Sequence, residues 1–243
     1  MNPDKTDLLF FPAKSSPMRD LTISVDNALV SSGTTAKNLG VILDSQLSFK
    51  AHITAVARSC RYTLYNIRRI RPFLTQESAQ LLVQASVISK LDYCNSLLTG
   101  LPACALKPLQ MIQNAAARLV FNQPKFSHVT PLLRSLHWLP VIARTEYKSL
   151  VLAYKAIRGM APSYLQNMIQ PYKPTRSLRS ANTGKLAEPS LKHPGQRSTR
   201  PRLFSLLAPK LWNELPIALR TADSLPIFCR NLKTHLFRLH LGT

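Results

Sequence analysis

The chain has 243 residues, of which 45% are hydrophobic, and 32 Lys and Arg against 11 Asp and Glu give it a net charge of +21. Because this length and hydrophobic content suffice for one large core or two small ones, the composition excludes a disordered polycation. No stretch reaches the ~18 uninterrupted apolar residues of a membrane span, and the first residues lack the basic and apolar pattern of a targeting segment. We therefore expect an intracellular protein, cytoplasmic or nuclear.

The positive charge is distributed unevenly along the chain. Residues 1–47 carry a net charge of −1, residues 48–170 carry +12, residues 171–202 carry +7 and the last 41 residues carry +3. Since each phosphate that Lys or Arg neutralises releases counterions, such an excess on a foldable chain favours a polyanionic partner. Nucleic acid is the first candidate, ahead of an anionic membrane surface. We predict neither a membrane partner nor a small-molecule substrate, and the sequence leaves the oligomeric state open.

Residues 1–47 are predicted to form a small antiparallel sheet. Residues 8–11 are an apolar run closed by Pro12, and residues 21–25 alternate with period two. A second apolar run, 39–43, is reached through the turn-prone residues 31–33. Because so small a sheet with two exposed edges is marginal by itself, we expect it to lean on the helices that follow.

From Ser48 onward, apolar residues recur at steps of three and four, which predicts a helical bundle over residues 48–170. Thr75 is a predicted N-cap and Gly159 a predicted helix end. The predicted helices cover 48–71, 75–98, 108–121 and 141–158. Apolar residues surround most of the second helix, so we expect it at the centre of the bundle.

The rest of the chain divides into two further segments. Residues 171–202 contain five prolines and no helical periodicity, which predicts a basic irregular connector. Residues 203–243 regain apolar content and are predicted to form a small C-terminal helical module. Trp138 and Trp212 each lie beside a leucine and are predicted to anchor the core. The predicted fold class is therefore α+β, mainly α.

The first predicted helix carries a cationic face. At ~100° per residue, several basic residues and one tyrosine fall within about a third of the circumference, next to the apolar stripe and without an acid among them. These residues are Lys50, Arg58, Arg61, Tyr65, Arg68 and Arg69. Guanidinium groups bind phosphates in bidentate fashion and a tyrosine ring can stack on a base, so the face suits nucleic acid. The alternative is an ordinary solvated helix face.

A second, shorter cationic stripe is predicted on the helix over 141–158. It consists of Arg144, Lys148, Lys155 and Arg158, and Val151 interrupts it. The connector is basic as well, with only Glu188 against its eight Lys and Arg residues. It either follows a phosphate backbone and orders on binding or is a soluble linker.

No catalytic residue and no metal site are predicted. Two-metal phosphoryl transfer needs converging carboxylates, whereas the 11 acids here are scattered without an adjacent pair. Cys60, Cys94, Cys104 and Cys229 are widely separated and lack His partners at metal-ligand spacing, so we expect small buried apolar groups. With only 7 glycines, the chain contains no glycine-rich phosphate loop.

Short motifs occur along nearly the whole chain in a characteristic order. They are Asn2-Pro3-Asp4-Lys5-Thr6, Asn38-Leu39-Gly40-Val41-Ile42-Leu43-Asp44-Ser45, Leu91-Asp92-Tyr93-Cys94-Asn95, Leu136-His137-Trp138-Leu139-Pro140, Gly159-Met160-Ala161-Pro162, Ala208-Pro209-Lys210-Leu211-Trp212-Asn213 and Leu232-Lys233-Thr234-His235-Leu236-Phe237. Together they resemble the C-terminal part of the reverse transcriptases (RNA-directed DNA polymerases) of LINE-type, non-LTR retrotransposons.

The resemblance implies an architecture. Residues 1–47 would be the end of a palm, with Leu39, Gly40 and Val41 in a primer-grip-like segment. Residues 48–170 would be a thumb whose first helix lies along a template–primer duplex. The family's catalytic aspartates belong before Met1, so the resemblance implies a truncated fragment that binds RNA, DNA or their hybrid without polymerising. It implies no cofactor for this chain, because Mg²⁺ would be needed only together with the catalytic palm.

Two alternatives remain open at this point. One is an α-helical interaction protein whose basic surface docks an acidic partner. The other is a translated relic of a decayed retroelement, with no function of its own.

Overall fold

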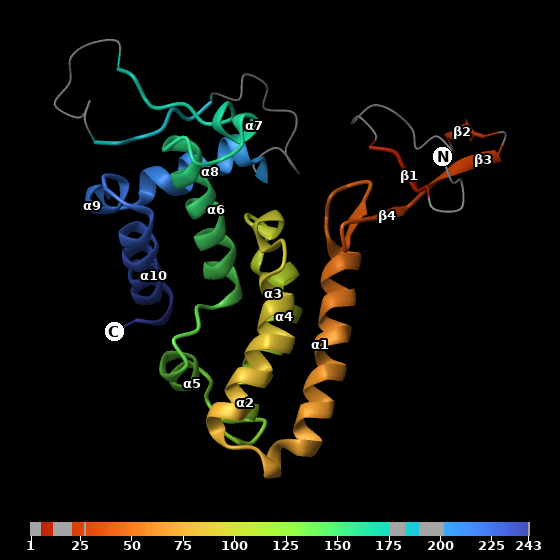
Figure 1. Cartoon of the computed structure of the whole chain (residues 1–243), viewed down its shortest axis with the longest axis vertical. Helices are drawn as coiled ribbons and strands as arrows, with labels where there is room; N and C mark the ends of the chain where they lie inside the picture. The colour runs from red at the N-terminus through yellow and green to blue at the C-terminus, as the bar shows by residue number, and fades with distance from the viewer. Residues whose placement is uncertain (1–5, 12–20, 27, 175–182, 190–201, 243) are drawn as a thin grey trace.

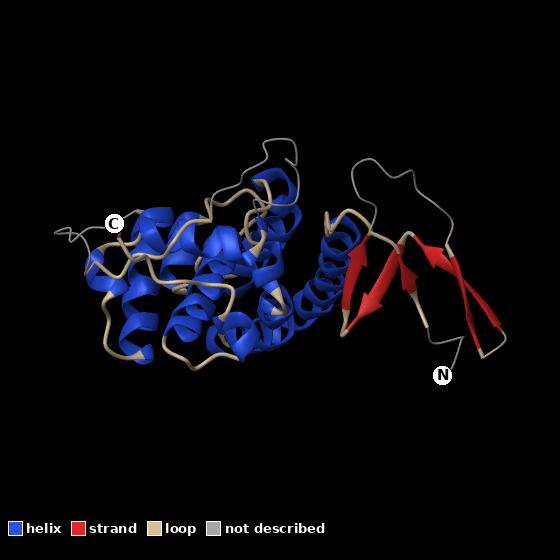
Figure 2. Ribbon diagram, turned by 90° about the horizontal axis from the view of Figure 1, so that it is seen from above, coloured by secondary structure: helices blue, strands red, loops and turns tan. Residues whose placement is uncertain are grey.

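The structure, a computed structural model, describes residues 6–11, 21–26, 28–174, 183–189 and 202–242. Figure 1 shows the strands at one side of the molecule, next to the first helix, and the remaining helices packed on the other side of that helix. Seen from above, the strands extend away from the helical part (Figure 2). The predicted fold class, α+β and mainly α, is confirmed.

The N-terminal strands form two small sheets rather than one. Their bounds are β1 Leu8–Leu9, β2 Thr22–Val25, β3 Ala28–Gly33, β4 Thr35–Asn38 and β5 Val41–Asp44. The first sheet has the order β1-β3-β2, with β2 antiparallel and β1 parallel to β3, and β4 and β5 form a separate antiparallel hairpin. Residues 31–33, predicted as a turn, are instead the last three residues of β3. Ser31 pairs with β2, and Ser32 and Gly33 pair with β1.

The β4–β5 hairpin turns through two residues and is fixed to the helices. Leu39 and Gly40 have φ angles of 45° and 83°, the left-handed conformations that a two-residue hairpin turn requires. The hydroxyl of Tyr93 donates a hydrogen bond of 2.6 Å to the carbonyl oxygen of Leu39. Val41 is buried and belongs to the main core. The hairpin is therefore held against the helical part at its tip and at its second strand.

The helices follow the predicted periodicity, with changes at their ends. Their bounds are α1 Lys50–Ile70, α2 Gln76–Val83, α3 Ser89–Asp92, α4 Ala103–Val120, α5 Thr130–Ser135, α6 Val141–Ile157, α7 Ser163–Gln166, α8 Phe204–Glu214, α9 Ile217–Arg220 and α10 Leu225–Leu241. The predicted cap is confirmed, because the Thr75 side chain accepts a hydrogen bond from the backbone N–H of Ser78. α4 begins before its predicted start because Pro102 occupies the N-cap, and Pro108 inside the helix removes only one N–H donor.

The predicted central position of the second helix is wrong. Leu81 is 70% exposed and Ala85 is exposed, so this segment buries only one side. A π-helical turn, 84–88, joins α2 to α3 and brings both Val87 and Ile88 into the core. The central helix is instead α4, which packs against α1, α2, α5 and α6.

Two hydrophobic cores hold the helices together. The first lies among α1, α2, α4 and the β4–β5 hairpin, and Trp138 belongs to it. The second lies among α6, α8 and α10, where the rings of Tyr154 and Phe228 stack with centroids 4.4 Å apart beside the buried Trp212. Both tryptophans are core anchors, as predicted. Helix α6 thus shares one core with α8 and α10.

Part of the predicted irregular connector is attached to α8. The Trp212 indole donates to the carbonyl of Gly184 at 2.8 Å, and Asn213 makes hydrogen bonds of 2.9 and 3.0 Å with the backbone of Leu186. Leu186 is 3% exposed and also forms an isolated β-bridge with Pro171. Residues 175–182 and 190–201 of the predicted connector lie outside the described residues.

Candidate nucleic-acid interface

The predicted cationic face of α1 is exposed along the whole helix. Lys50, Arg58, Arg61, Tyr65, Arg68 and Arg69 are all exposed. The adjoining side of α1, including Ile53, Cys60 and Leu64, is buried in the first core. α1 stands at the edge of the helical part (Figure 1), so the side of the helix that carries these residues remains exposed.

These side chains lack a partner among the described residues. None of the six makes a side-chain hydrogen bond or an ion pair there, and the ion pairs Arg144–Asp92 and His240–Glu146 lie on other helices. The last turn of α1 places Arg68 and Arg69 at the negative end of the helix dipole, where cations interact favourably with the helix. In the part of the chain that the structure describes, the face therefore presents unpaired cations that an external anion can pair.

A groove runs between the C-terminal half of α1 and α4. It has a volume of about 340 Å³. Arg61, Tyr65 and Arg68 line it from α1, and Met111, which is 56% exposed, lies in it on α4. The remaining lining residues are Leu64, Ile112, Ala115, Arg118, Leu119, Gln123 and Lys125. An apolar floor between cationic rims suits a strand whose bases cover the floor while its phosphates meet the rims.

A second hollow, of about 610 Å³, lies at the other end of the same face. Lys50 and Arg58 line it from α1, and Thr34, Thr35 and Gln46 line it from the segment around the β4–β5 hairpin. The cationic face therefore connects two concave regions, one at each end of α1.

Asp44, at the end of β5, fixes the start of α1. Its carboxylate accepts hydrogen bonds from the backbone N–H groups of Phe49 at 2.7 Å and Ser48 at 2.9 Å. Although partial burial raises the pKa of Asp44, the hydrogen bonds from Ser48 and Phe49 outweigh it, and the pKa is lower than usual. This carboxylate is therefore engaged by the backbone of the turn before α1.

His52 joins the same strand to α1. Its Nδ1 atom accepts a hydrogen bond of 3.4 Å from the backbone N–H of Ile42, which requires the neutral ring. Burial lowers the pKa of His52 and favours that neutral form. Asp44 and His52 together orient the hairpin relative to the cationic face.

The predicted stripe on α6 is not a continuous free cationic face. Arg144 forms an ion pair of 2.7 Å with Asp92, and its Nε donates to the carbonyl of Leu139. Arg158 donates to the carbonyl of Ala222 at 2.7 Å. Lys155 is half-buried and Lys148 is exposed. The two arginines therefore join α6 to α3 and to the turn after α9.

The primer-grip-like residues lie at the hairpin turn. Leu39 is 84% exposed, Gly40 lies beside the Tyr93 ring, and Val41 is 4% exposed. The hairpin thus presents the Leu39 side chain at its tip, directly before α1 in the chain.

The connector's basic residues are only partly described. Lys173 and Lys185 are exposed, whereas Arg202 donates a hydrogen bond of 2.8 Å to the carbonyl of Leu47. The others, Arg176, Arg179, Lys192, Arg197 and Arg200, lie outside the described residues.

The cysteines differ in their surroundings. Cys60 is buried as expected, Cys94 and Cys229 are half-buried, and Cys104 is exposed, contrary to the expectation for a small apolar group. Within the described ranges, no group of three or more His, Cys, Asp and Glu residues is placed to hold a metal ion. In the same part of the chain, no helix combines the length and apolar character needed to cross a membrane.

Sequence reasoning missed the α4 side of the groove. Met111, Arg118 and Lys125 lie 40 or more positions after the α1 residues they face, and only the packing of the two helices brings them together. The one available signal was the position of Arg118 at the end of a predicted helix, followed by Lys125 in a loop. No protein-family model, curated protein or solved structure matches this chain.

Proposed function

We propose that this chain binds nucleic acid along the cationic face of α1, as the thumb-like part of a LINE-type reverse transcriptase. The observation that carries the proposal is that Lys50, Arg58, Arg61, Arg68 and Arg69 share one exposed face with Tyr65 and lack internal partners among the described residues. The resemblance of the ordered motifs to that family supplies the polymerase context.

The dimensions of α1 suit a short strand or one side of a duplex. Its 21 residues span about 31 Å at 1.5 Å per residue. At about 3.4 Å per nucleotide, that length accommodates on the order of nine stacked nucleotides. The arginines take phosphates, the Tyr65 ring can stack on a base, and Met111 provides an apolar contact at the groove. This chemistry is sequence-tolerant and accepts RNA, DNA or their hybrid.

The position of the hairpin agrees with the primer-grip-like role that the resemblance implies. The hairpin immediately precedes α1 and is fixed to it by Asp44 and His52. A strand lying along α1 would meet Thr34, Thr35 and Gln46, at the open end of the hairpin, near Lys50 and Arg58. In this proposal, the hairpin positions the end of the strand and α1 holds its backbone.

Charge reversal on α1 tests the proposal directly. We expect Arg58→Glu, Arg61→Glu and Arg68→Glu, combined in one variant, to weaken binding of a 12-nucleotide RNA or RNA–DNA hybrid at least 100-fold, measured by fluorescence anisotropy. A matched control reverses three exposed lysines elsewhere, Lys107, Lys185 and Lys210, and so changes the net charge equally. Equal losses in the two variants would mean that only net charge matters and would contradict the proposal.

Salt dependence separates this function from docking to an acidic protein. A footprint of about six phosphates should lose on the order of 10³ in affinity between 50 and 200 mM salt, because bound counterions are released. A packed protein interface changes far less. An affinity for nucleic acid that changes little with salt would favour the interaction-protein alternative. Binding to an acidic protein without binding to nucleic acid would favour it as well.

The proposal assigns binding, and not the chemical step, to this chain. Given a primed template, dNTPs and Mg²⁺, the purified protein should retain the template–primer without extending the primer. Primer extension on a sequencing gel would contradict this part of the proposal while leaving the binding face untouched.

A further inference from the structure

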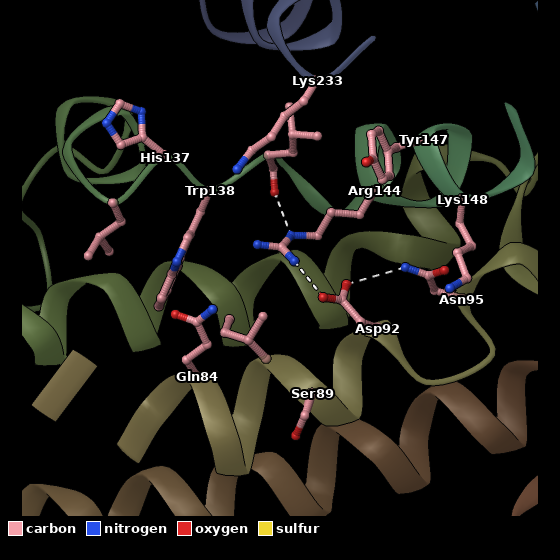
Figure 3. Close-up of a pocket in the computed structure, with 13 residues that line it drawn as sticks. Gln84, Ser89, Asp92, Asn95, His137, Trp138, Arg144, Tyr147, Lys148 and Lys233 are labelled. Carbon is pink, nitrogen blue, oxygen red and sulfur yellow. Dashed lines mark hydrogen bonds and ion pairs between the residues drawn. The ribbon is translucent and has the colours of Figure 1, made fainter. Parts of the chain in front are cut away.

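A hollow of about 530 Å³ lies between the segment 84–95, the segment 136–139 and helices α6 and α10. Figure 3 shows its lining: Trp138 stands at one wall, Arg144 crosses the middle, Lys148 enters from α6 and Lys233 from α10. No residue of α1 lines it. The hollow is therefore a site distinct from the cationic face of α1, and its volume is that of a small organic ligand.

The charges of the hollow favour an anion. Arg144 and Asp92 neutralise each other through their 2.7 Å ion pair. Lys148 and Lys233 form no ion pair with any described residue, and both are exposed. They reach the hollow from different helices, on either side of Arg144, so both make the hollow positive (Figure 3).

A buried acceptor in the same wall lacks a donor. Asn95 is 4% exposed, and its Nδ2 atom donates to Asp92 at 3.3 Å. Its Oδ1 atom has no hydrogen-bond partner among the described residues. Since an unpaired buried carbonyl oxygen costs free energy, a ligand that brings an N–H or O–H group to Asn95 would gain from pairing it.

The remaining wall is apolar and rigid. Ile88, Leu136 and Trp138 are all buried core residues that also line the hollow. The Arg144–Asp92 ion pair fixes α6 to α3 across it. A planar ring can lie against this wall without moving the backbone.

We propose that this hollow binds a nucleotide, with its phosphate attracted by the positive charges of Lys148 and Lys233 and an N–H or O–H donor of the base or sugar at Asn95. A nucleotide combines the anionic group, the donor and the planar ring that these walls accommodate. It is either a free mononucleotide or the phosphorylated end of a strand, since both present the same groups.

The two tryptophans allow a direct test in the intact chain. In ¹H–¹⁵N spectra, adenosine 5′-monophosphate should shift the indole N–H signal of Trp138 and leave that of Trp212, which is hydrogen-bonded to Gly184 in the other core, unchanged. Trp138→Phe assigns the signal. Adenosine without phosphate should bind at least 10-fold more weakly. No Trp138 shift with millimolar nucleotide or a phosphorylated strand end, or equal binding of adenosine, would overturn the proposal.

Variants separate this site from the α1 face. Lys148→Glu and Lys233→Glu should each weaken the nucleotide about 10-fold, whereas Lys107→Glu, an equal charge change outside the hollow, should not; equal losses would overturn the proposal. The α1 triple charge reversal should leave nucleotide binding intact. In the triple variant, the Trp138 signal can then be followed with two ligands, the free nucleotide and a strand with a 5′-phosphate. A shift with the strand alone would assign the hollow to strand ends.

Discussion

The cationic faces of α1 and α6 resemble each other in sequence and differ in the structure. On α1, Arg61 and Arg68 are exposed and lack partners among the described residues. On α6, Arg144 and Arg158 are tied to Asp92 and to the carbonyl of Ala222. The difference follows from position: α1 lies at the edge of the helical part, whereas α6 is covered by α3, α4, α8 and α10.

This comparison shows what an amphipathic stripe can and cannot establish. A stripe of cations at helical spacing fixes which side chains share a face. Whether the face meets water or another helix depends on elements distant in the chain. Arginines at helical spacing therefore form an exposed face on one helix and internal crosslinks on the other.

The largest effect that sharpens this contrast is expected at Arg144. We expect Arg144→Ala to lower the free energy of unfolding by about 2 kcal/mol, because it leaves Asp92 and the Leu139 carbonyl without their partner. Arg61→Ala, the matched change on α1, should stay within about 0.5 kcal/mol. Urea unfolding followed by circular dichroism measures both. Equal stability losses would show that α1 also uses its arginines internally.

An intermediate effect is expected at the groove of α1. Tyr65 lines the groove, whereas Tyr62, on the same helix and 70% exposed, does not. Removing a ring that stacks on a base costs about 1–3 kcal/mol, so Tyr65→Ala should weaken single-stranded RNA binding about 10-fold or more. Tyr62→Ala should change the affinity less than twofold. If the two variants bind alike, the groove is not where the bases lie.

The smallest effect concerns pH and the junction between hairpin and helix. Burial holds the pKa of His52 below its usual value of 6.5, so the unfolded chain takes up a proton first and stability falls as pH drops below about 6.5. Asp44 has a lowered pKa, so its contribution persists at this pH and is lost only at much lower pH, as the folded carboxylate is protonated.

Hydrogen exchange of the Ile42 N–H reports this junction, because that group donates to His52. Its exchange protection should decrease between pH 7 and pH 5 after correction for intrinsic rates. His52→Gln should flatten that decrease. If the wild-type protein and the His52→Gln variant show the same dependence of protection on pH, His52 does not stabilise the junction.

Much of α1 could be predicted because its information is local. Ile53, Cys60 and Leu64 fix the buried side, and the exposed positions of Arg61 and Arg68 follow from the same period. The Thr75 cap and the end of α6 before Gly159, which has a φ of 70°, rest on local backbone chemistry in the same way.

The features that could not be predicted from the sequence depend on contacts between distant segments. The pairing of Arg144 with Asp92 joins residues 52 positions apart, and no periodicity encodes it. The groove needs Met111 and Lys125 beside α1, and the parallel pairing of β1 with β3 joins residues 24 positions apart. The exposure of Leu81 reflects the same limit, since an apolar residue is buried only where another element covers it.

The π-helical turn at residues 84–88 sets the rotational phase of everything that follows it in this segment. One extra residue in the turn rotates the downstream side chains by about 100° relative to an uninterrupted helix. Asp92 reaches Arg144, and Asn95 reaches the hollow, only in this phase. A one-residue deletion here would leave the composition almost unchanged and yet rotate both side chains away from Arg144 and the hollow. The π-helical turn therefore determines which side chains of this segment face α6.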